Sequence, residues 1–405
     1  MPSLQSQYDV IIAGGGPAGA SAAIHLAAKK LRVLVVEQKR FPRAKLCGEF
    51  ISPECLLHFD KLGVRNEMLA TKPSQISKTV FYSRYGSKIE VPSRWFGGAM
   101  ALGLSRSAMD EALLKRAQSL GVDVLEQATV FNLLREGKTV CGVRVRRNVD
   151  EQDLLAPLVV DATGRAGVLV RKAEPGSSQR HQKHKLVAFK AHLTGARGDP
   201  EACEIYSYPG GYGGLSGVEN GFSNLCFIIE ARHVIDAHSD PGKVIEQHVM
   251  SNLRAAHTLK EAALASEWLS VSLESFGRRK PSAAPGLLAI GDSAAFIDPF
   301  TGSGMLMALE SGQLVAEIIV RYGDKLAVLA AKNSLGEEYA RAYRKRFDAR
   351  LRLCSLLRRV ALKPTWAQMT ISLCGSSDRF RNWLVRSTRS SVKQNAATIP
   401  QPKSV

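Results

Sequence analysis

Three glycines near the N-terminus have the spacing of a pyrophosphate-binding loop. Gly14, Gly16 and Gly19 form the pattern G-x-G-x-x-G. The first glycine of this pattern permits a tight turn, the second lets the backbone approach a pyrophosphate, and the third lets a helix pack closely on a strand. The N-terminus of the following helix, which begins at Pro17 and Ala18, favours an anion.

These glycines need a strand, a helix and a second strand to position them. Val10 to Ala13 is an apolar run of strand length, an alanine-rich helix follows the glycines, and residues 32–36 form a second strand that ends at Glu37. A lone glycine motif would also fit an ordinary turn between a strand and a helix. Because all the parts are in register, residues 8–37 are interpreted as a dinucleotide-binding βαβ unit, with Glu37 accepting hydrogen bonds from ribose hydroxyls.

Two later segments distinguish between the possible dinucleotides. Residues 158–167 read LVVDATGRAG, a buried strand that ends in a turn of small residues. Residues 287–304 read LLAIGDSAAFIDPFTGSG, and a long helix with many small residues is predicted to begin near Met305.

In this order and at these separations, the three segments resemble the p-hydroxybenzoate hydroxylase-like FAD superfamily. The cofactor-binding residues that the resemblance implies in the two later segments are Asp161, Gly164, Gly291, Asp292, Pro299, Gly302 and Gly304. The resemblance implies that Asp292 binds the ribityl chain of FAD, although an aspartate there could also cap the next helix. It also implies that Gly302 and Gly304 place backbone N–H groups near the flavin pyrimidine oxygen, where negative charge grows on reduction. Arg106 matches an arginine that opens a helix touching the FAD, and the alternative for it is a solvated arginine at a helix start.

Residues 41–53, FPRAKLCGEFISP, resemble a segment of the geranylgeranyl reductase family in which a Cys-Gly pair passes close to the isoalloxazine ring. The resemblance implies that Cys47 and Gly48 lie at the flavin, with Cys47 a candidate catalytic residue. The alternative is a small buried thiol that packs a loop. Arg43 either neutralises the pyrophosphate or lies on the surface. The chain lacks the Trp-x-Trp-x-Ile-Pro signature of tryptophan halogenases, which argues against halogenation.

A tyrosine-rich stretch precedes five residues, Gly210 to Gly214, of which four are glycines. Because no helix pattern follows, this stretch is interpreted as a loop of the substrate domain rather than a second nucleotide site. Its position resembles the aromatic-Pro-Gly stretch that borders the cavity of geranylgeranyl reductases, although it lacks the family's tryptophan. Tyr206, Tyr208 and Tyr212 are therefore candidate substrate contacts, and the alternative is that they fill the core of a sheet.

The chain has a formal net charge of +18, and much of the excess lies in its C-terminal part. No zinc-finger spacing or aromatic RNA-binding signature accompanies it, which argues against a nucleic-acid partner. Apolar residues four apart, from Tyr339 through Tyr343 and Phe347 to Leu351, predict a helical stripe that closes the back of the FAD domain. The alternative adds peripheral contact between the basic C-terminal region, with Trp366 and further apolar residues beyond it, and an anionic membrane.

The seven scattered cysteines, the polar N-terminus and the short apolar runs predict a cytoplasmic protein without a spanning segment. The alternative is a peripheral location at the inner face of the membrane.

The expected fold is α/β, with a Rossmann-type (GR2-like) FAD-binding domain interleaved with a β-rich substrate domain. The FAD domain is expected from residues 1–75, 101–175 and 275–330, and the substrate domain from 76–100 and 176–274. A basic C-terminal helical region and tail, 331–405, follows. No metal site is expected.

The expected function is that of an FAD-dependent oxidoreductase charged by NAD(P)H or a reduced carrier. It would resemble geranylgeranyl reductases and reduce C=C bonds of a small hydrophobic substrate. The alternatives are a monooxygenase that hydroxylates or epoxidises a hydrophobic or aromatic substrate, and a non-catalytic flavin-binding redox sensor.

Overall fold

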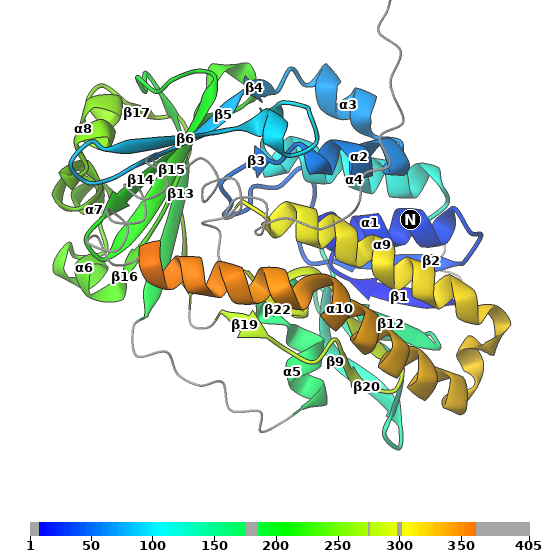
Figure 1. Cartoon of the computed structure of the whole chain (residues 1–405). Helices are drawn as coiled ribbons and strands as arrows, with labels where there is room; N and C mark the ends of the chain where they lie inside the picture. The colour runs from blue at the N-terminus through cyan, green and yellow to red at the C-terminus, as the bar shows by residue number, and fades with distance from the viewer. Residues whose placement is uncertain (1–7, 175–184, 274–275, 298–301, 362–405) are drawn as a thin grey trace, which may run out of the picture.

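In the computed structural model, the apolar run at the N-terminus forms a central strand of a six-stranded sheet (Figure 1). The structure describes residues 8–174, 185–273, 276–297 and 302–361. Strand order is β20-β21-β12-β1-β2-β8, and only β20 runs antiparallel to its neighbour. The strands are β1 (Val10–Ala13), β2 (Val33–Glu37), β8 (Asp123–Glu126), β12 (Leu158–Asp161), β20 (Ser282–Ala284) and β21 (Leu287–Ala289). The strand predicted at residues 10–13 is confirmed.

Alternate residues of β1 enter two different cores. Val10 and Ile12 pack among the helices, whereas Ile11 and Ala13 face a small sheet in the order β11-β10-β9. Since both faces are covered, β1 is apolar throughout, as parallel strands usually are. The helices are α1 (Pro17–Ala27), α2 (Glu54–Leu62), α3 (Arg65–Ala70), α4 (Arg106–Ser119), α5 (Val168–Ala173) and α9 (Gly304–Tyr322), and the small sheet consists of β9 (Thr129–Glu136), β10 (Thr139–Arg147) and β11 (Asp150–Leu155).

Helix α9 packs directly against the backbone of α1. A Cβ added to Gly312 would lie 2.5 Å from the carbonyl oxygen of Ala18, so only glycine permits this approach. The predicted long helix with small residues, packed tightly between layers, is therefore confirmed. It holds α1 and its glycine loop in place.

A second sheet of eight strands stands beside the first (Figure 1). Its order is β17-β13-β16-β15-β14-β5-β6, and β18 also pairs with β13. The strands are β5 (Lys78–Tyr82), β6 (Lys88–Pro92), β13 (Leu186–Thr194), β14 (Ala202–Tyr208), β15 (Gly211–Gly217), β16 (Ser223–Glu230), β17 (Ala263–Leu264) and β18 (Leu269–Leu273). Helices on one face are α6 (Ala231–Asp236), α7 (Pro241–Gln247) and α8 (Leu253–Leu259).

The two sheets together confirm the predicted fold class, while the exact division into domains stays a prediction. The remaining short elements are β3 (Phe50–Ile51), β4 (Ser74–Ile76), β7 (Ala101–Gly103), β19 (Gly277–Arg278), β22 (Ala295–Phe296), η1 (Ser93–Trp95), η2 (Gly164–Ala166), η3 (Glu219–Gly221), η4 (Val249–Ser251), η5 (Gly291–Ser293) and η7 (Gly323–Ala327).

The glycine-rich stretch after Pro209 is not a loop, and this prediction was wrong. Only Gly210 lies in the turn, with φ +76°, and β15 begins at Gly211. A Cβ on Gly211 would approach Tyr208 to 2.6 Å, and one on Gly213 would approach Phe227 to 2.7 Å. The glycines therefore let a central strand pack closely against its neighbours.

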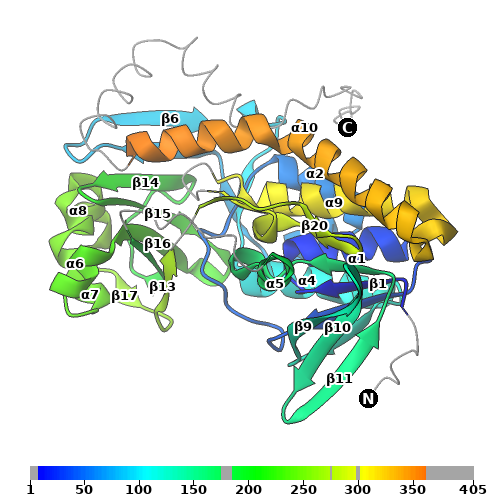
Figure 2. The same ribbon diagram turned by 90° about the horizontal axis from the view of Figure 1, so that it is seen from below.

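Helix α10 (Leu329–Ala361) runs along α9 and on toward the eight-stranded sheet (Figures 1 and 2). The predicted stripe from Tyr339 to Leu351 is buried in the same core as α1 and α9, which confirms that it closes the FAD domain. Two arginines of this helix, Arg346 and Arg350, turn inward to Glu310 on α9. Trp366 and the apolar residues beyond it lie outside the described residues.

Candidate active site

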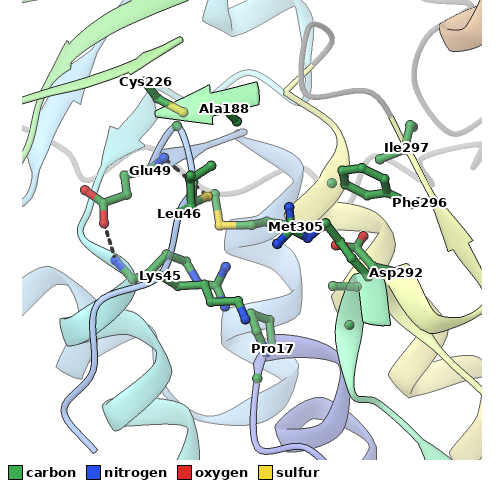
Figure 3. A pocket seen from close by; sticks show the side chains of 18 of the residues that line it. Pro17, Lys45, Leu46, Glu49, Ala188, Cys226, Asp292, Phe296, Ile297 and Met305 are labelled. Carbon is green, nitrogen blue, oxygen red and sulfur yellow. Dashed lines mark hydrogen bonds between the residues drawn. The ribbon is translucent and has the colours of Figure 1, made fainter. Parts of the chain in front are cut away.

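A cavity of about 740 Å³ lies between the glycine loop and the inner face of the eight-stranded sheet. Figure 3 shows Ala188 and Cys226 from that sheet on one side and Pro17 of α1 on another. This volume is in the range of small-molecule sites. The predicted site residues that line the cavity are Gly14, Gly16, Pro17, Ala18, Glu37, Arg43, Cys47, Gly48, Arg106, Gly164, Gly291, Asp292, Gly302, Gly304 and Tyr212.

The three loop glycines differ in what surrounds them. A side chain on Gly14, which has φ +111°, would collide with the carbonyl oxygen of Ala162. One on Gly19 would collide with the carbonyl oxygen of Gly14, so Gly19 lets helix and strand pack closely without lining the cavity. A Cβ on Gly16 would lie 3.7 Å and 3.8 Å from the guanidinium groups of Arg43 and Arg106. Gly16 therefore faces a space bounded by two cations.

Those cations have capacity to bind an anion. Arg106 donates two hydrogen bonds to Asp110, at 2.8 and 2.7 Å. Arg43 lies 3.2 Å from Asp110 and 3.5 Å from Glu37, but its buried Nε and Nη1 make no hydrogen bond within the described part of the chain. Gly16 caps α1 with no side-chain hydrogen bond to the helix N-terminus. The helix end and the two guanidinium groups thus fit a pyrophosphate.

Glu37 and Asp292 mark two further parts of the cavity. The Glu37 carboxylate ends β2 and accepts hydrogen bonds from the backbone N–H groups of Gly15 and Lys39, both at 2.9 Å. Asp292 lies in η5, where burial raises its pKa and the nearby Arg106 and other cations oppose that rise. The positions of Glu37, Gly16 and Asp292 along one cavity fit an extended FAD, with Gly302 and Gly304 at the start of α9.

Asp161 does not touch the cavity, which corrects its assignment as a cofactor ligand. Its carboxylate accepts hydrogen bonds from the backbone of Thr163, Leu169 and Val170 and from the hydroxyl of Ser293, at 2.9 to 3.0 Å. These bonds satisfy the N-terminus of α5 and fix the turn beside the glycine loop. Its role is therefore to hold the shape of the cofactor cradle, which consists of the glycine loop, Glu37, Arg43, Arg106 and Asp292. Pro299 lies outside the described residues.

Tyr206 and Tyr208 do not line the cavity either, so two of the three predicted tyrosine contacts were wrong. Both are fully buried on the opposite face of β14, among the helices α6 to α8. Because successive side chains of a strand point to opposite faces, the neighbours Ile205 and Ser207 face the cavity instead. Of the three tyrosines, Tyr212 alone lies at the cavity.

Cys47 lies where the cofactor-binding segment meets the eight-stranded sheet. Its thiol accepts a hydrogen bond from the backbone N–H of Glu49 at 3.4 Å, and the side-chain amide of Asn224 donates to its carbonyl oxygen at 3.2 Å. Burial raises the pKa of the Cys47 thiol. The thiol is therefore protonated at neutral pH, which suits a proton donor better than a nucleophile.

Sequence reasoning missed five charged residues near this cavity. Lys45 and Arg165 line it, and burial lowers the pKa of both side chains. Glu49, Lys190 and His192 form a buried cluster beside Cys47. A signal for the last two was present, because Lys190 and His192 alternate with apolar residues on a predicted strand and must share one face.

The fold and this cavity define an FAD-dependent oxidoreductase. Residues 7–322 match the family described as FAD binding domain, and the chain belongs to that family. Digeranylgeranylglycerophospholipid reductase of Methanosarcina mazei is 28% identical over 319 residues, which cover 78% of this chain and 75% of that protein.

Solved structures show the same fold. The flavin-dependent brominase Bmp2 has a TM-score of 0.78 at 22% identity, covering 94% of this chain and 93% of its own. A geranylgeranyl bacteriochlorophyll reductase-like protein of Thermoplasma acidophilum has a TM-score of 0.73 at 21% identity, covering 95% of this chain and 92% of its own. The resemblance to geranylgeranyl reductases seen in the sequence is thus confirmed.

Proposed function

We propose that the protein reduces carbon–carbon double bonds of a hydrophobic substrate. The observation that carries this proposal is that one cavity joins the cofactor cradle to an apolar wall. The wall is formed by side chains on the inner face of the eight-stranded sheet and from β22, among them Ala188, Ile205, Ile228, Leu273 and Phe296. The relatives named as digeranylgeranylglycerophospholipid reductases support the same reaction class.

When bound and reduced, FAD would supply a hydride to the double bond. The glycine loop, Arg43 and Arg106 would hold its pyrophosphate, and Asp292 its ribityl chain. The apolar wall excludes water from the reacting carbon atoms, and Cys47 holds a proton at Sγ. We propose NAD(P)H or a reduced carrier as the external reductant, since the described residues contain one glycine-loop βαβ unit.

Product analysis with and without oxygen tests this function. The chemically reduced protein is mixed with a polyprenyl lipid in the absence of oxygen, and the product is analysed by mass spectrometry. A double-bond reductase adds one hydrogen molecule per turnover under these conditions. A product that forms only with oxygen and gains an oxygen atom would instead identify a monooxygenase. Flavin reduction without any product from either arm would favour a redox sensor.

We further propose peripheral contact with an anionic membrane through the basic C-terminal region. The support is a set of exposed cations on α10, together with the exposed side chain of Leu356. These cations are Arg341, Arg344, Lys345 and Arg352. Each basic residue at a lipid surface contributes about 1 kcal/mol. In the ranges that the structure describes, no helix has both the length and the apolar character to cross a membrane.

Co-sedimentation with anionic liposomes at low and high salt tests the membrane proposal. Full-length protein should bind at low salt and dissociate at high salt, and replacing Arg341, Arg344 and Lys345 by glutamate should weaken the binding. A chain stopped after residue 361 keeps α10 and separates its contribution from that of the tail. Full-length protein that stays in the supernatant at low salt would refute the contact.

A further inference from the structure

Three side chains, Glu49, Lys190 and His192, form a hydrogen-bonded cluster at the edge of the cavity, where Glu49 lines the cavity and also accepts a hydrogen bond from the backbone N–H of Arg106 at 2.9 Å. The Nζ of Lys190 lies 2.8 Å from Oε1 of Glu49, and Nε2 of His192 lies 2.6 Å from Oε2. Glu49 and Lys190 are 1% and 3% exposed, whereas the side chain of His192 is 20% exposed. The cluster therefore forms a hydrogen-bonded chain from a partly exposed histidine to two buried side chains.

The inner end of this path reaches the cavity at two thiols. The backbone N–H of Glu49 donates to Sγ of Cys47, and Lys190 stands directly opposite Cys226 in the register of β13 and β16. Cys47 and Cys226 both line the cavity. Burial raises the pKa of Cys226, and its ionisable neighbours are Cys47, Lys190 and Glu49. Glu49 therefore borders the thiol of Cys47, and Lys190 borders that of Cys226.

We propose that His192, Glu49 and Lys190 relay the proton that the reaction consumes from solvent to the thiols of the cavity. This proposal rests on the proposed function, in which a double bond receives a hydride at one carbon and a proton at the other. A thiol gives up the proton and regains one from the Lys190 ammonium group. Glu49 then passes a proton from His192 to Lys190, and His192 recovers one from water. Each group returns to its starting state, and one proton has crossed.

A second buried carboxylate shows what a purely structural ion pair looks like in the same sheet. Glu204, on the opposite face, accepts hydrogen bonds from the Arg254 side chain, from the backbone of Asp199 at 2.9 Å and from the Tyr206 hydroxyl at 2.8 Å. None of its described partners lines the cavity. Glu49 differs because it lines the cavity itself and because one of its partners, His192, is partly exposed.

The test separates flavin reduction from product formation. H192A, E49Q and the control E204Q are purified, their FAD content is measured, and the reduced proteins are mixed with a polyprenyl lipid without oxygen. We expect normal FAD content and flavin reduction in all of them. Product formation should slow about tenfold or more in H192A and E49Q but not in E204Q. Added imidazole should restore H192A, because it can replace the lost side chain at the partly exposed position.

Alkylation of Cys47 gives a readout that does not depend on turnover. Glu49→Gln removes a negative charge next to the thiol, so the pH midpoint for alkylation by iodoacetamide should fall, and it should stay unchanged in E204Q. Product formation at the wild-type rate in both H192A and E49Q would overturn the relay alone. A wild-type protein that forms no reduced product would overturn the relay and the proposed function together. If E49Q fails to fold, H192A and its rescue decide the question.

Discussion

The cofactor cradle and the inner face of the eight-stranded sheet build the same cavity by different means. In the cradle, backbone atoms form the surface, and side chains on Gly14 or Gly19 would collide with carbonyl oxygens. On the sheet, side chains form the surface. A shift of one residue along β14 would place Tyr206 at the cavity instead of Ile205. The cradle therefore depends on the absence of side chains at fixed positions, whereas the sheet depends on strand register.

The largest effect should follow from breaking the cradle. Gly16→Val places a β-branched side chain between the two guanidinium groups and the helix N-terminus, where the pyrophosphate would lie. We expect a colourless, folded protein whose FAD affinity falls about a hundredfold or more, equivalent to roughly 2.7 kcal/mol. Gly242→Val, at an exposed position in α7, is the matched control. Full flavin occupancy in the purified Gly16→Val protein would contradict the assignment.

Acid should destabilise the helices beside the six-stranded sheet rather than the eight-stranded sheet. His58 of α2 is buried near Glu310 of α9 and His25 of α1, and burial lowers its pKa to about 4. Because the unfolded state gains a proton near pH 6.5 and the folded state does not, stability should fall as the pH drops from 6.5 toward 4. The loss between pH 7 and pH 5 is about 2 kcal/mol. Denaturant unfolding of His58→Gln should show a smaller slope, since His25, whose pKa burial also lowers, still contributes, and the exposed His238→Gln should retain the wild-type slope.

Cys47 lies where the cofactor-binding segment meets the eight-stranded sheet, so its replacement tests the contact between the two regions. Cys47→Ala should leave FAD content unchanged and slow product formation about tenfold, because a proton donor is lost next to the cavity. Cys55→Ala removes a fully buried thiol of α2 that lies away from the cavity and controls for packing. Kinetics and products identical to wild type in Cys47→Ala would leave this thiol a packing residue only.

The smallest effects should come from the sheet, where two tyrosines on opposite faces can be compared. Tyr206→Phe removes a hydrogen bond to the buried Glu204 and should lower the free energy of unfolding by about 1 kcal/mol without changing KM. Tyr212→Ala enlarges the cavity and should change KM for the hydrophobic substrate. Thermal unfolding and steady-state kinetics distinguish them. A changed KM in Tyr206→Phe would mean that the Tyr206 side chain faces the cavity.

The contrast also explains which parts of the site could be predicted from sequence. The loop glycines and the strand before them are adjacent in the chain, so local spacing predicts them. The cluster of Glu49 with Lys190 and His192 joins residues that are distant in sequence and that meet only when the segment before β3 packs on the eight-stranded sheet. Asp161 was misassigned for a related reason, since a motif gives its place at the end of β12 but not the direction of its carboxylate. Sequence reasoning identified the fold class and the family, but not the side of each strand that meets the substrate.

The order of strands along the chain has a consequence for how the protein is made. Strands β5 and β6, residues 78–92, belong to the eight-stranded sheet, but their partner β14 begins only at residue 202. The six-stranded sheet starts at residue 10 and gains β21 only at residue 287. Neither sheet can close during early synthesis, so β5 and β6 leave the ribosome with unpaired edges. A nascent chain with such edges depends on protection from aggregation until its last strands emerge.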